Sequence, residues 1–478
     1  MKTTLKKLSI PRPSGGFDDL YTEDFITKEK LKEQIAELKK LIYRLHFETD
    51  ETTDLHPFYI KSLEDENVVY NSNSDCRLAT HAADVEYSYG YSWMNLGDVE
   101  TISLNEGEKV YFRYVGSEYL SGEVLTSTTK TFDVGGDIRT VIYGNTKVES
   151  VSDYELKVLF SGTNVVNANK LLMMFNSVGE YGYASMFENC TSLTTAPELP
   201  ATTLANYCYD NMFSGCTSLT TAPELPATTL ADSCYNNIFS GCTSLTTAPE
   251  LPATTLANYC YYSMFNGCSG LTTTPELPST TLADYCYDSM FYGCTSLTTT
   301  LELPATTLAS YCYNSMFEGC TSLTNTPELP ATTLASYCYN SMFRDCTGLT
   351  KAPELPATTL ASYCYNSMFY GCTSLTQAPE LPATTLADYC YYYMFYNCTS
   401  LTTVPELPAT ILKSNCYRSM FQGCTSLTQA QELPATTLES NCYRSMFQGC
   451  TSLITAPELP ATTLTYQCYY YMLQCCTS

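Results

Sequence analysis

Hydrophobic and polar positions recur with a fixed period over the last two thirds of the chain. Eleven full copies of a 26-residue unit run from Met186 to Tyr471, and each copy keeps nearly the same order of apolar and polar residues. One cysteine marks this period in steps of 26 residues from Cys190 to Cys476. Such a period predicts a solenoid, in which each coil buries its apolar face only by stacking on its neighbours.

The apolar positions inside one copy predict a short helix. In the copy around Cys208, an apolar residue stands at every fourth position from Leu204 to Cys216, which places these residues along one side of a helix. A threonine at position 202 or 203 is available as the N-cap. The residue before the second cysteine is Gly in most copies and Asn or Asp in others. These residue types tolerate a positive φ and therefore predict where the helix ends.

The rest of the copy predicts a strand and a turn. The run SLTTA is compatible with a short strand, and Pro197 and Pro200 end it because proline lacks the amide hydrogen that a sheet needs. We therefore expect an α/β solenoid over residues 171–478, with a parallel sheet on one face, short helices on the other and an incomplete last coil.

The first 50 residues are expected to contain a tail and a coiled-coil helix. An apolar seam spaced 4-3-4-3 runs through residues 28–46, with Ile at a and Leu at d, a combination typical of parallel dimers that also permits trimers. The seam consists of Leu31, Ile35, Leu38, Ile42 and Leu45. We expect a homo-oligomer through this segment. The alternative is an amphipathic helix that packs on its own domain.

Residues 55–170 have a different sequence pattern and lack the 26-residue repeat. Short aromatic and β-branched runs alternate with turn sequences such as NEGEK and VGGD. This pattern predicts an antiparallel β-domain, in the form of a β-sandwich. The single tryptophan, Trp93, lies in this region and is expected to pack in the core.

Composition and charge narrow the possible functions. The 478 residues include 49 acidic and 24 basic side chains, and the net charge of −25 disfavours nucleic acid as a partner, because phosphate binding needs a basic face. No export signal follows the basic N-terminus, and no stretch approaches the ~18 apolar residues of a membrane span, so membrane insertion is not expected. All three histidines lie outside the repeats, and the sequence contains no catalytic triad, zinc-ligand spacing or phosphate loop. We expect no enzymatic activity, no cofactor and no metal.

Stacking turns each repeated residue into a column. Two columns hold 23 of the 25 cysteines, and we expect buried free thiols there, because the spacings fit neither zinc ligands nor a disulfide within one coil. One glutamate per coil forms a column from Glu198 to Glu458, which we expect to be solvated, with a Ca²⁺ site as the alternative. The tyrosines equivalent to Tyr209 are expected to pack inside.

The repeat also carries a family resemblance. The segment MFSGCTSLTTAPELP resembles the leucine-rich repeats of the BspA-like family, whose usual unit reads roughly AFxGCxxLxxVxIP on a shorter period. The copies depart from that unit by extra residues in the expected helix and by Pro197 in the expected strand, which leaves the local turn geometry open. The resemblance implies a solenoid of leucine-rich-repeat type that binds surfaces and has no catalytic activity.

A second resemblance implies a partner and a location. The segment YSYGYSWMNLGDVETISLNEGEKVYFRYVG resembles the β-domain that precedes such repeats in proteins of gut bacteria and their phages. Phage proteins with this arrangement are suspected fibre or appendage components. We therefore expect an adhesion protein of the virion that contacts a protein or glycan on the host-cell surface. The alternatives are a bacterial surface adhesin and an intracellular protein-binding scaffold, at the cell surface or in the bacterial cytoplasm.

The candidate binding residues lie on a stripe that varies between copies. Steps of four from Asn206 give Asp210 and Ser214, away from the side of Cys208. Drift at exposed positions also explains variety there, but the substitutions lean toward Tyr, Arg and Asn, which suit stacking on sugars or anchoring in protein pockets. The candidates are Tyr262, Tyr292, Arg344, Tyr370, Tyr392, Tyr396, Arg418, Arg444, Tyr466 and Tyr470.

Overall fold

The computed structural model describes the strands at 8–11 and 17–20 and residues 57–476, apart from residues 91, 118, 123, 127 and 300. The chain divides into two compact units, Met1–Leu55 and His56–Ser478. In the first unit, β1 (Leu8–Pro11) pairs with β2 (Phe17–Leu20) in the antiparallel sense. The heptad segment at 28–46 lies outside the described residues, so the coiled coil stays a prediction.

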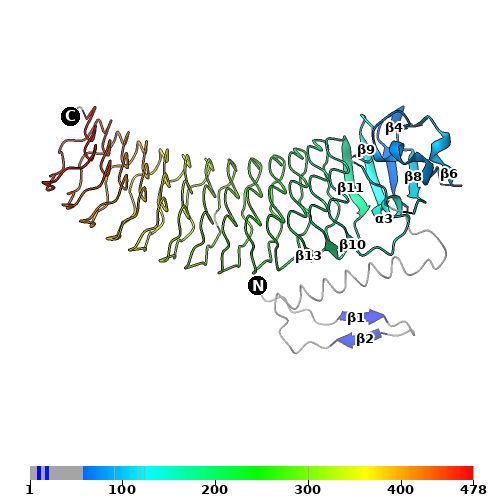
Figure 1. The fold of residues 1–478 in the computed structure, drawn as a ribbon, viewed down its shortest axis with the longest axis horizontal. Helices are drawn as coiled ribbons and strands as arrows, with labels where there is room; N and C mark the ends of the chain where they lie inside the picture. The colour runs from blue at the N-terminus through cyan, green and yellow to red at the C-terminus, as the bar shows by residue number, and fades with distance from the viewer. Residues whose placement is uncertain are drawn as a thin grey trace. The chain divides into compact units, whose positions relative to one another are not determined.

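The second unit begins with a β-domain built on one six-stranded sheet (Figure 1). The strand order is β11-β9-β3-β8-β5-β6, and neighbours are antiparallel apart from the parallel pair β11 and β9. A second sheet contains only β4 and β7. The strands are β3 (Tyr59–Ser62), β4 (Asn67–Asn71), β5 (Val85–Ser88), β6 (Met94–Asn95), β7 (Thr101–Leu104), β8 (Lys109–Tyr114), β9 (Phe132–Asp137) and β11 (Val165–Leu172). The predicted β-domain is largely antiparallel, and its description as a sandwich stays a prediction.

The central strands bury alternate side chains, whereas Trp93, which was expected in the core, lies at the edge of the sheet. In β8 every second side chain from Val110 to Tyr114 is buried, as expected for a strand with one face on the core. Trp93 is not a core residue. It is half-buried beside the exposed edge strand β6, and the guanidinium carbon of Arg113 lies 4.3 Å from its ring centroid. Two short helices, α2 (Arg77–Thr80) and α3 (Ile138–Ile142), complete the domain, together with 3-10 turns at Ala82–Asp84 and Leu96–Asp98.

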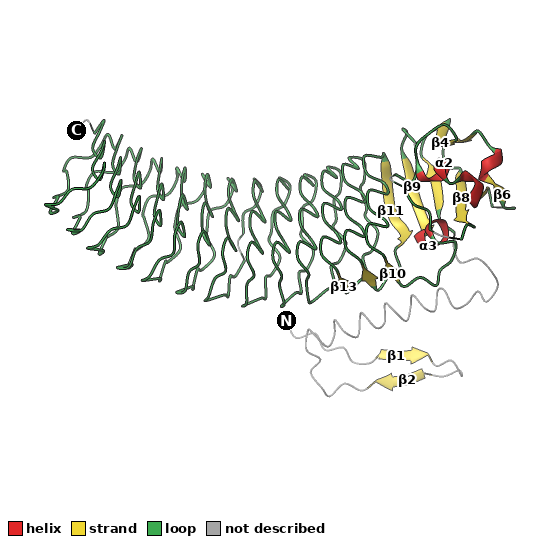
Figure 2. Ribbon diagram, viewed as in Figure 1, coloured by secondary structure: helices red, strands yellow, loops and turns green. Residues whose placement is uncertain are grey.

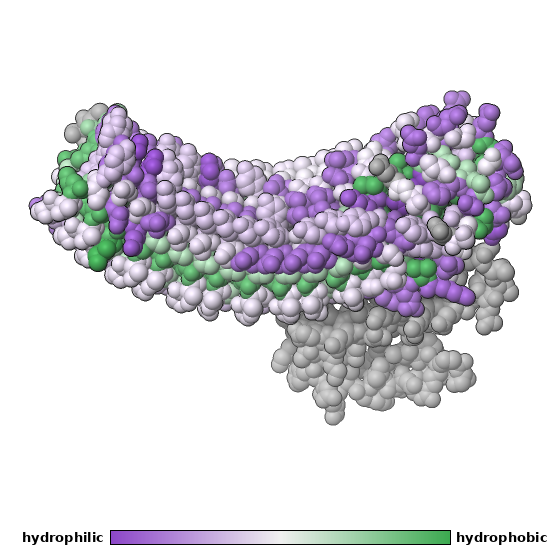
Figure 3. All heavy atoms as spheres, in the orientation of Figure 1, coloured by the Kyte–Doolittle hydropathy of each residue, from purple (hydrophilic) through white to green (hydrophobic). Residues whose placement is uncertain are grey.

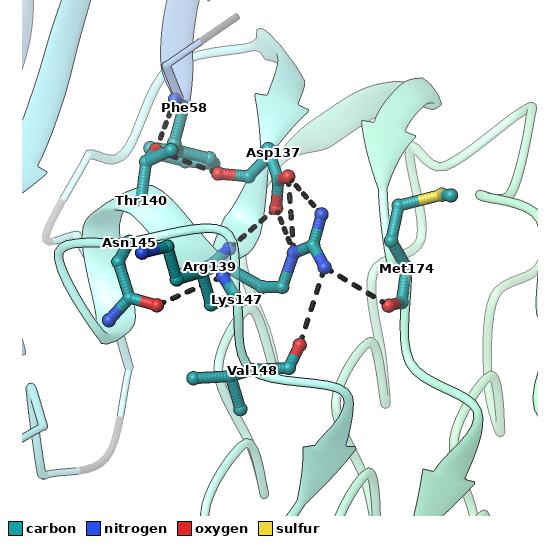
Figure 4. A network of polar contacts seen from close by, with 8 residues as sticks. All are labelled: Phe58, Asp137, Arg139, Thr140, Asn145, Lys147, Val148 and Met174. Atoms are coloured by element: carbon teal, nitrogen blue, oxygen red, sulfur yellow. Dashed lines mark hydrogen bonds and ion pairs between the residues drawn. The ribbon is translucent and has the colours of Figure 1, made fainter. Parts of the chain in front are cut away.

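A polar network joins the β-domain to the first coils (Figure 4). Asp137, at the end of β9, accepts hydrogen bonds from the backbone amide and the guanidinium of Arg139, with a closest ion-pair distance of 2.6 Å. The same guanidinium donates to the carbonyls of Val148 and Met174, at 3.3 Å each. Because Met174 follows β11, a single side chain ties the sheet to the start of the solenoid.

The coil geometry begins earlier than residue 171. Strand β11 pairs with β9 on one side, and on the other side the chain bridges to Thr195 of the next coil. The run from Tyr154 to Gly162 has a positive φ at every fourth residue, as the later coils do. Alternate amides of this run donate to carbonyls of residues 180–188, so it stacks on the coil that follows. A divergent first coil therefore lies within the range predicted for the β-domain.

The helix predicted for each coil is wrong. Among the described residues of 181–476 there is no helix, and the segment 207–216 is a series of overlapping turns (Figure 2). Its amides alternate between two kinds of partner. The amide of Met212 donates to the carbonyl of Tyr209 in the same coil at 3.1 Å, whereas the amide of Tyr209 donates to Cys234 in the next coil at 3.0 Å. Half of the amides thus bond between coils, which an α-helix does not allow.

Left-handed residues explain how the turns repeat. The φ angle is 56° at Tyr207, 54° at Asn211 and 75° at Gly215, so every fourth residue is left-handed. The sequence analysis recognised only the last of these positions. A turn series with a period of four buries the same side chains as a helix with a period of 3.6 over so short a span. The burial pattern was therefore predictable, although the backbone conformation was not.

The predicted parallel sheet is reduced to small contacts between coils. Thr195 pairs with Thr221 through a single parallel bridge, and later coils repeat this contact. A second row of parallel contacts begins with three two-residue strands and continues as bridges from Thr229 onward. The three strands are β10 (Ser150–Val151), β12 (Ser177–Val178) and β13 (Thr203–Leu204). In most coils, proline on either side of the repeated glutamate position keeps any strand from lengthening.

Columns of identical side chains form the solenoid core. Cys208, Tyr209, Met212, Phe213 and Cys216 are each at most 1% exposed, which confirms that the Tyr209 column packs inside. Rings stack from coil to coil, for example with 5.7 Å between the centroids of Phe213 and Phe239. The coils follow one another in a single row from the β-domain to the C-terminal end (Figure 1).

Candidate binding surface

The turn geometry leaves two of every four residues outside. In the coil of Cys208, positions 208, 209, 212 and 213 are buried, whereas 206, 207, 210, 211 and 214 are partly or fully exposed. A column is the set of residues at 26-residue steps, named by its member in this coil. We call columns 206, 207, 210, 211 and 214 the outer columns, although some of their smaller side chains in other coils, such as Asp288 and Ser341, are buried. Figure 3 shows rows of similarly coloured side chains that run along the stacked coils.

All ten candidate residues lie in outer columns. Column 206 contains Tyr466, column 210 contains Tyr262, Tyr392, Arg418, Arg444 and Tyr470, and column 214 contains Tyr292, Arg344, Tyr370 and Tyr396. All are partly or fully exposed, up to 70% for Tyr466. The steps of four that defined the stripe coincide with the period of the turns, so these columns face outward although the helix is absent. The structure gathers seven of the ten, places Tyr466 near Tyr470 in the same coil, and leaves Tyr262 and Tyr292 apart from them.

A first group contains Arg344, Tyr370 and Tyr396 in column 214. The guanidinium carbon of Arg344 lies 4.6 Å from the ring centroid of Tyr370, and that ring stacks on Tyr396 with a centroid distance of 4.6 Å. The Arg344 Nε atom is also 3.6 Å from a carboxylate oxygen of Glu318 and 3.6 Å from one of Asp345. The positive charge of Arg344 is therefore compensated locally.

A second group consists of Tyr392, Arg418, Arg444 and Tyr470, which follow one another in column 210. The guanidinium of Arg418 lies 5.4 Å from the ring centroid of Tyr392, and that of Arg444 lies 5.1 Å from the centroid of Tyr470. Two tyrosine rings thus flank two guanidinium groups. Such cation–π contacts contribute about 0.5–1 kcal/mol each at exposed sites.

The two guanidinium groups of this second group have only neutral hydrogen-bond partners. Arg418 Nη1 donates to Asn415 Oδ1 at 3.2 Å. Arg444 Nη1 donates to Asn441 Oδ1 at 3.4 Å and to Gln467 Oε1 at 2.5 Å. Because Arg418 and Arg444 occupy the same column in adjacent coils, their like charges repel each other. We call Arg418 and Arg444 the arginine pair.

Tyr393 connects the two groups, although the sequence analysis did not select it. Its ring centroid lies 4.0 Å from that of Tyr392 and 5.2 Å from that of Tyr396. The seven gathered residues and Tyr393 therefore form one continuous surface over the C-terminal half of the solenoid. Tyr393 stands at a left-handed position, with a φ of 55°, and is partly exposed.

The sequence analysis also missed a stack of tyrosines in column 207. Six rings, from Tyr259 to Tyr389, stack with centroid distances of 4.3–4.5 Å between successive coils. Burial and the neighbouring rings raise the pKa of Tyr363 to about 12. Because the ring faces cover one another, this column presents mainly ring edges and hydroxyl groups. The recurrence of Tyr two residues before the buried Tyr209 column was the available sequence signal.

A family model decides what kind of solenoid this is. The model described as the BspA type leucine rich repeat region matches residues 167–298, 261–392 and 336–476. The chain belongs to the BspA-type leucine-rich repeat family. No curated protein and no solved structure matches the chain. The match to the BspA-type model begins inside β11, where the structure also places the first coil.

BspA-type membership sets the class of function. Leucine-rich repeat proteins are generally binding or adhesion proteins, and the BspA-like family is a non-enzymatic repeat family. In the part of the chain that the structure describes, no helix is long and apolar enough to cross a membrane. Within the same residues, no group of three or more His, Cys, Asp or Glu side chains is placed to hold a metal ion.

The thiols of the BspA-type coils are structural. Every cysteine from 76 to 468 is buried and free, Cys476 is half-buried, and Cys475 is exposed. In column 216 each thiol donates to the carbonyl of a phenylalanine in the preceding coil, as from Cys216 to Phe187 at 3.0 Å. Burial raises the pKa of Cys268 to about 12, which keeps the thiol protonated. The glutamate column from Glu198 to Glu458 is exposed at every copy, as predicted.

Proposed function

We propose that this protein is a non-enzymatic adhesion protein that presents the outer columns of its solenoid to a partner on a host-cell surface. In this proposal it is a fibre or appendage component of a phage virion. The partner is a protein or a glycan of the host cell.

One observation carries the proposal. The buried columns barely change between coils, whereas column 210 runs through Asp, Asn, Tyr and Arg. An invariant frame combined with variable outer side chains is the arrangement that a binding solenoid needs, because the frame holds each side chain at a fixed spacing. Tyrosine and arginine concentrate in the C-terminal half of these columns, and both residue types are enriched at binding hot spots.

The proposed oligomer fits the same role. A dimer or trimer through residues 28–46 brings two or three solenoids together, and linked binding surfaces raise avidity without any new contact. Oligomerisation is therefore part of the proposed attachment mechanism.

Two measurements test the proposal. Mass spectrometry of purified virions should detect this chain at a copy number typical of an appendage component. The labelled full chain should also bind some members of a panel of cultured gut bacteria. A chain found only in the bacterial envelope favours a bacterial adhesin, and one found only in the cytoplasm with protein partners favours a scaffold. Absence from virions together with no attachment to any cell contradicts the proposal.

A further inference from the structure

We infer that the arginine pair binds the carboxylate of an acidic sugar on a host-cell glycan. The inference rests on the proposed function and names the ligand class for one part of the binding surface. The site consists of Arg418 and Arg444 between the rings of Tyr392 and Tyr470.

The first argument is the uncompensated charge. Among the described residues, neither arginine of the pair has a carboxylate within ion-pair distance, and the side chains that accept hydrogen bonds from them do so through amide oxygens. Arg344 shows the usual solution in the same solenoid, because Glu318 and Asp345 lie beside it. Two adjacent guanidinium groups without a counter-charge are stabilised when an anion binds between them. The planar fork of a guanidinium matches a carboxylate in a bidentate manner.

The second argument is the spacing. Tyr417 and Tyr443, which precede the two arginines in the chain, stack with their centroids 5.7 Å apart. The arginines occupy equivalent positions in adjacent coils, and the guanidinium of Arg418 lies near Tyr392 of the preceding coil, whereas that of Arg444 lies near Tyr470 of the following coil. Each is held by an asparagine three residues earlier, Asn415 and Asn441. The pair is therefore partly preorganised for a single small anion.

The third argument limits the number of charges on the ligand. The chain has a net charge of −25, and an exposed glutamate column runs through every coil. A polyanion would bring many negative charges close to this acidic surface and would be repelled. A single carboxylate interacts mainly with the arginine pair, because exposed charges beyond ~8 Å are largely screened at physiological ionic strength. The ligand therefore has isolated carboxylates, as a sugar acid at the end of a glycan does.

The fourth argument identifies the rest of the ligand as sugar. Tyr470 and Tyr471 are 39% and 47% exposed, so rings at this site are available to contact a ligand. Gln467 lies at the pair, and Gln448 and Gln474 bond to each other in column 214 of the same coils. Amide groups both donate and accept hydrogen bonds, which suits the hydroxyl groups of a sugar.

The test measures binding of small oligosaccharides to the immobilised full chain. The probes are sialyllactose, a disaccharide that ends in glucuronic acid, and lactose as the neutral counterpart. Both acidic probes should bind at least about ten-fold more tightly than lactose. Raising the salt concentration from about 0.05 to about 0.5 M should weaken the binding of the acidic probes and leave lactose unchanged.

Matched variants assign the effect to the pair. In the double variant R418Q/R444Q, the affinity for acidic probes should fall to that for lactose. In K413Q, which removes an exposed positive charge from the coil of Arg418 at a position outside the outer columns, affinity should stay within about two-fold. The variant R418K/R444K keeps the charges but loses the planar fork, so it should bind at an intermediate level. If R418Q/R444Q does not fold, the reduced affinity of R418K/R444K for the acidic probes tests the inference instead.

Three results would overturn the inference. Acidic probes could bind no more tightly than lactose, R418Q/R444Q could bind them as well as the wild type, or a poly-glutamate peptide could compete better than the sugars. Attachment of the wild-type chain to whole bacteria is measured in parallel. A chain that attaches to cells but ignores acidic sugars overturns this inference alone, whereas a chain that attaches to no cell contradicts the proposed function.

Discussion

The thiols of column 216 show how one residue type is selected by its position. Cys216 is fully buried and donates to the carbonyl of Phe187, which lies in the preceding coil. The same contact recurs between Cys242 and Phe213 at 3.2 Å. A thiol is small and apolar enough for the core and still satisfies a carbonyl, whereas alanine offers no donor. Regular cysteine spacing therefore reflects packing and hydrogen bonding.

We predict that most thiols are unreactive in the native protein. Alkylation or a colorimetric thiol reagent should modify Cys475 within minutes, Cys476 more slowly, and the buried thiols only after unfolding, because burial raises their pKa and blocks access. The variant Cys475→Ser should lose the fast phase. Modification of many thiols in the folded protein, or a series of disulfide-linked peptides, would refute a structural role.

Asp288 predicts a pH dependence of stability. Burial raises the pKa of this carboxyl to about 6, although hydrogen bonds from Ser289 and Asn314 oppose the shift. The unfolded carboxyl titrates near pH ~4. The native state therefore holds the proton more tightly, and stability decreases as the pH rises from about 4 to about 6. In the next three coils the same column contains asparagine, which is neutral at every pH.

The variant Asp288→Asn tests this sign. Its free energy of unfolding should exceed that of the wild type by about 1–3 kcal/mol at pH 7, and the difference should vanish below about pH 4. Denaturant unfolding at several pH values measures it. Asp284→Asn, at an exposed carboxylate of the same coil, serves as the control and should change stability by less than about 0.5 kcal/mol. A variant that is less stable at pH 7 would contradict the assignment.

At the scale of the element, the coil is a series of turns. Its amides alternate between partners inside the coil and partners in the next coil, and every fourth residue has a positive φ. Several of these residues are Tyr, Ser or Asn. L-residues other than glycine are strained in this conformation by about 1 kcal/mol or more. The contacts between coils must compensate for that strain.

Glycine substitution distinguishes this turn series from a helix. Ser341 has a φ of 53°, so Ser341→Gly should leave stability unchanged or raise it by up to about 1 kcal/mol. Ser341→Val should lower stability by more than about 1 kcal/mol, because a β-branched residue is strained at positive φ. In a helix, glycine would instead lower stability by about 1 kcal/mol. Ser336→Gly, at a position without a positive φ, is the control and should be destabilising. Thermal and denaturant unfolding provide the comparison.

The sequence predicted much of the coil and missed its backbone for an identifiable reason. The burial of Cys208, Met212 and Cys216 followed from their spacing, because periods of 3.6 and 4 coincide over two or three turns. Glycine at 215 indicated one left-handed position. Tyr207 gave no such indication, because tyrosine rarely adopts a positive φ, and the column of Asn211 gave none because it holds serine in most copies. The exposure of columns 206, 210 and 214 was therefore predicted from the sequence, while columns 207 and 211, with the stacked tyrosines and Tyr393, were not recognised.

At the scale of the molecule, the β-domain and the solenoid share one strand. β11 belongs to the six-stranded sheet and also starts the stack of coils. Turn residues and β-branched runs predicted the domain, but strand pairing depends on contacts between distant parts of the chain. The run from Tyr154 to Gly162 resembles the run from Tyr207 to Gly215 only in its Tyr, its Phe and its Ser-Gly end. That similarity was too weak to move the boundary.

Oligomerisation is the prediction for the N-terminal unit. Replacing Ile35 and Ile42 with Asp places charges in the heptad seam at residues 28–46, so the variant should be monomeric while the wild type is a dimer or trimer. Light scattering of both proteins measures the mass. A wild type that is already monomeric would count against the coiled coil. The same variant should attach more weakly to cells through lost avidity.

The central claim is that an invariant frame presents variable outer columns to a partner, and one paired measurement tests it directly. The full chain with Tyr392, Tyr396, Arg418 and Arg444 changed to Ser is compared with the wild type for attachment to host cells and for thermal unfolding. A control variant changes Tyr89 and Tyr119, which are exposed tyrosines of the β-domain outside the outer columns. The account predicts that the first variant loses most of its attachment while its unfolding midpoint moves by only a few degrees, and that the control behaves as the wild type. Undiminished attachment, or loss of folding in the first variant, would contradict it.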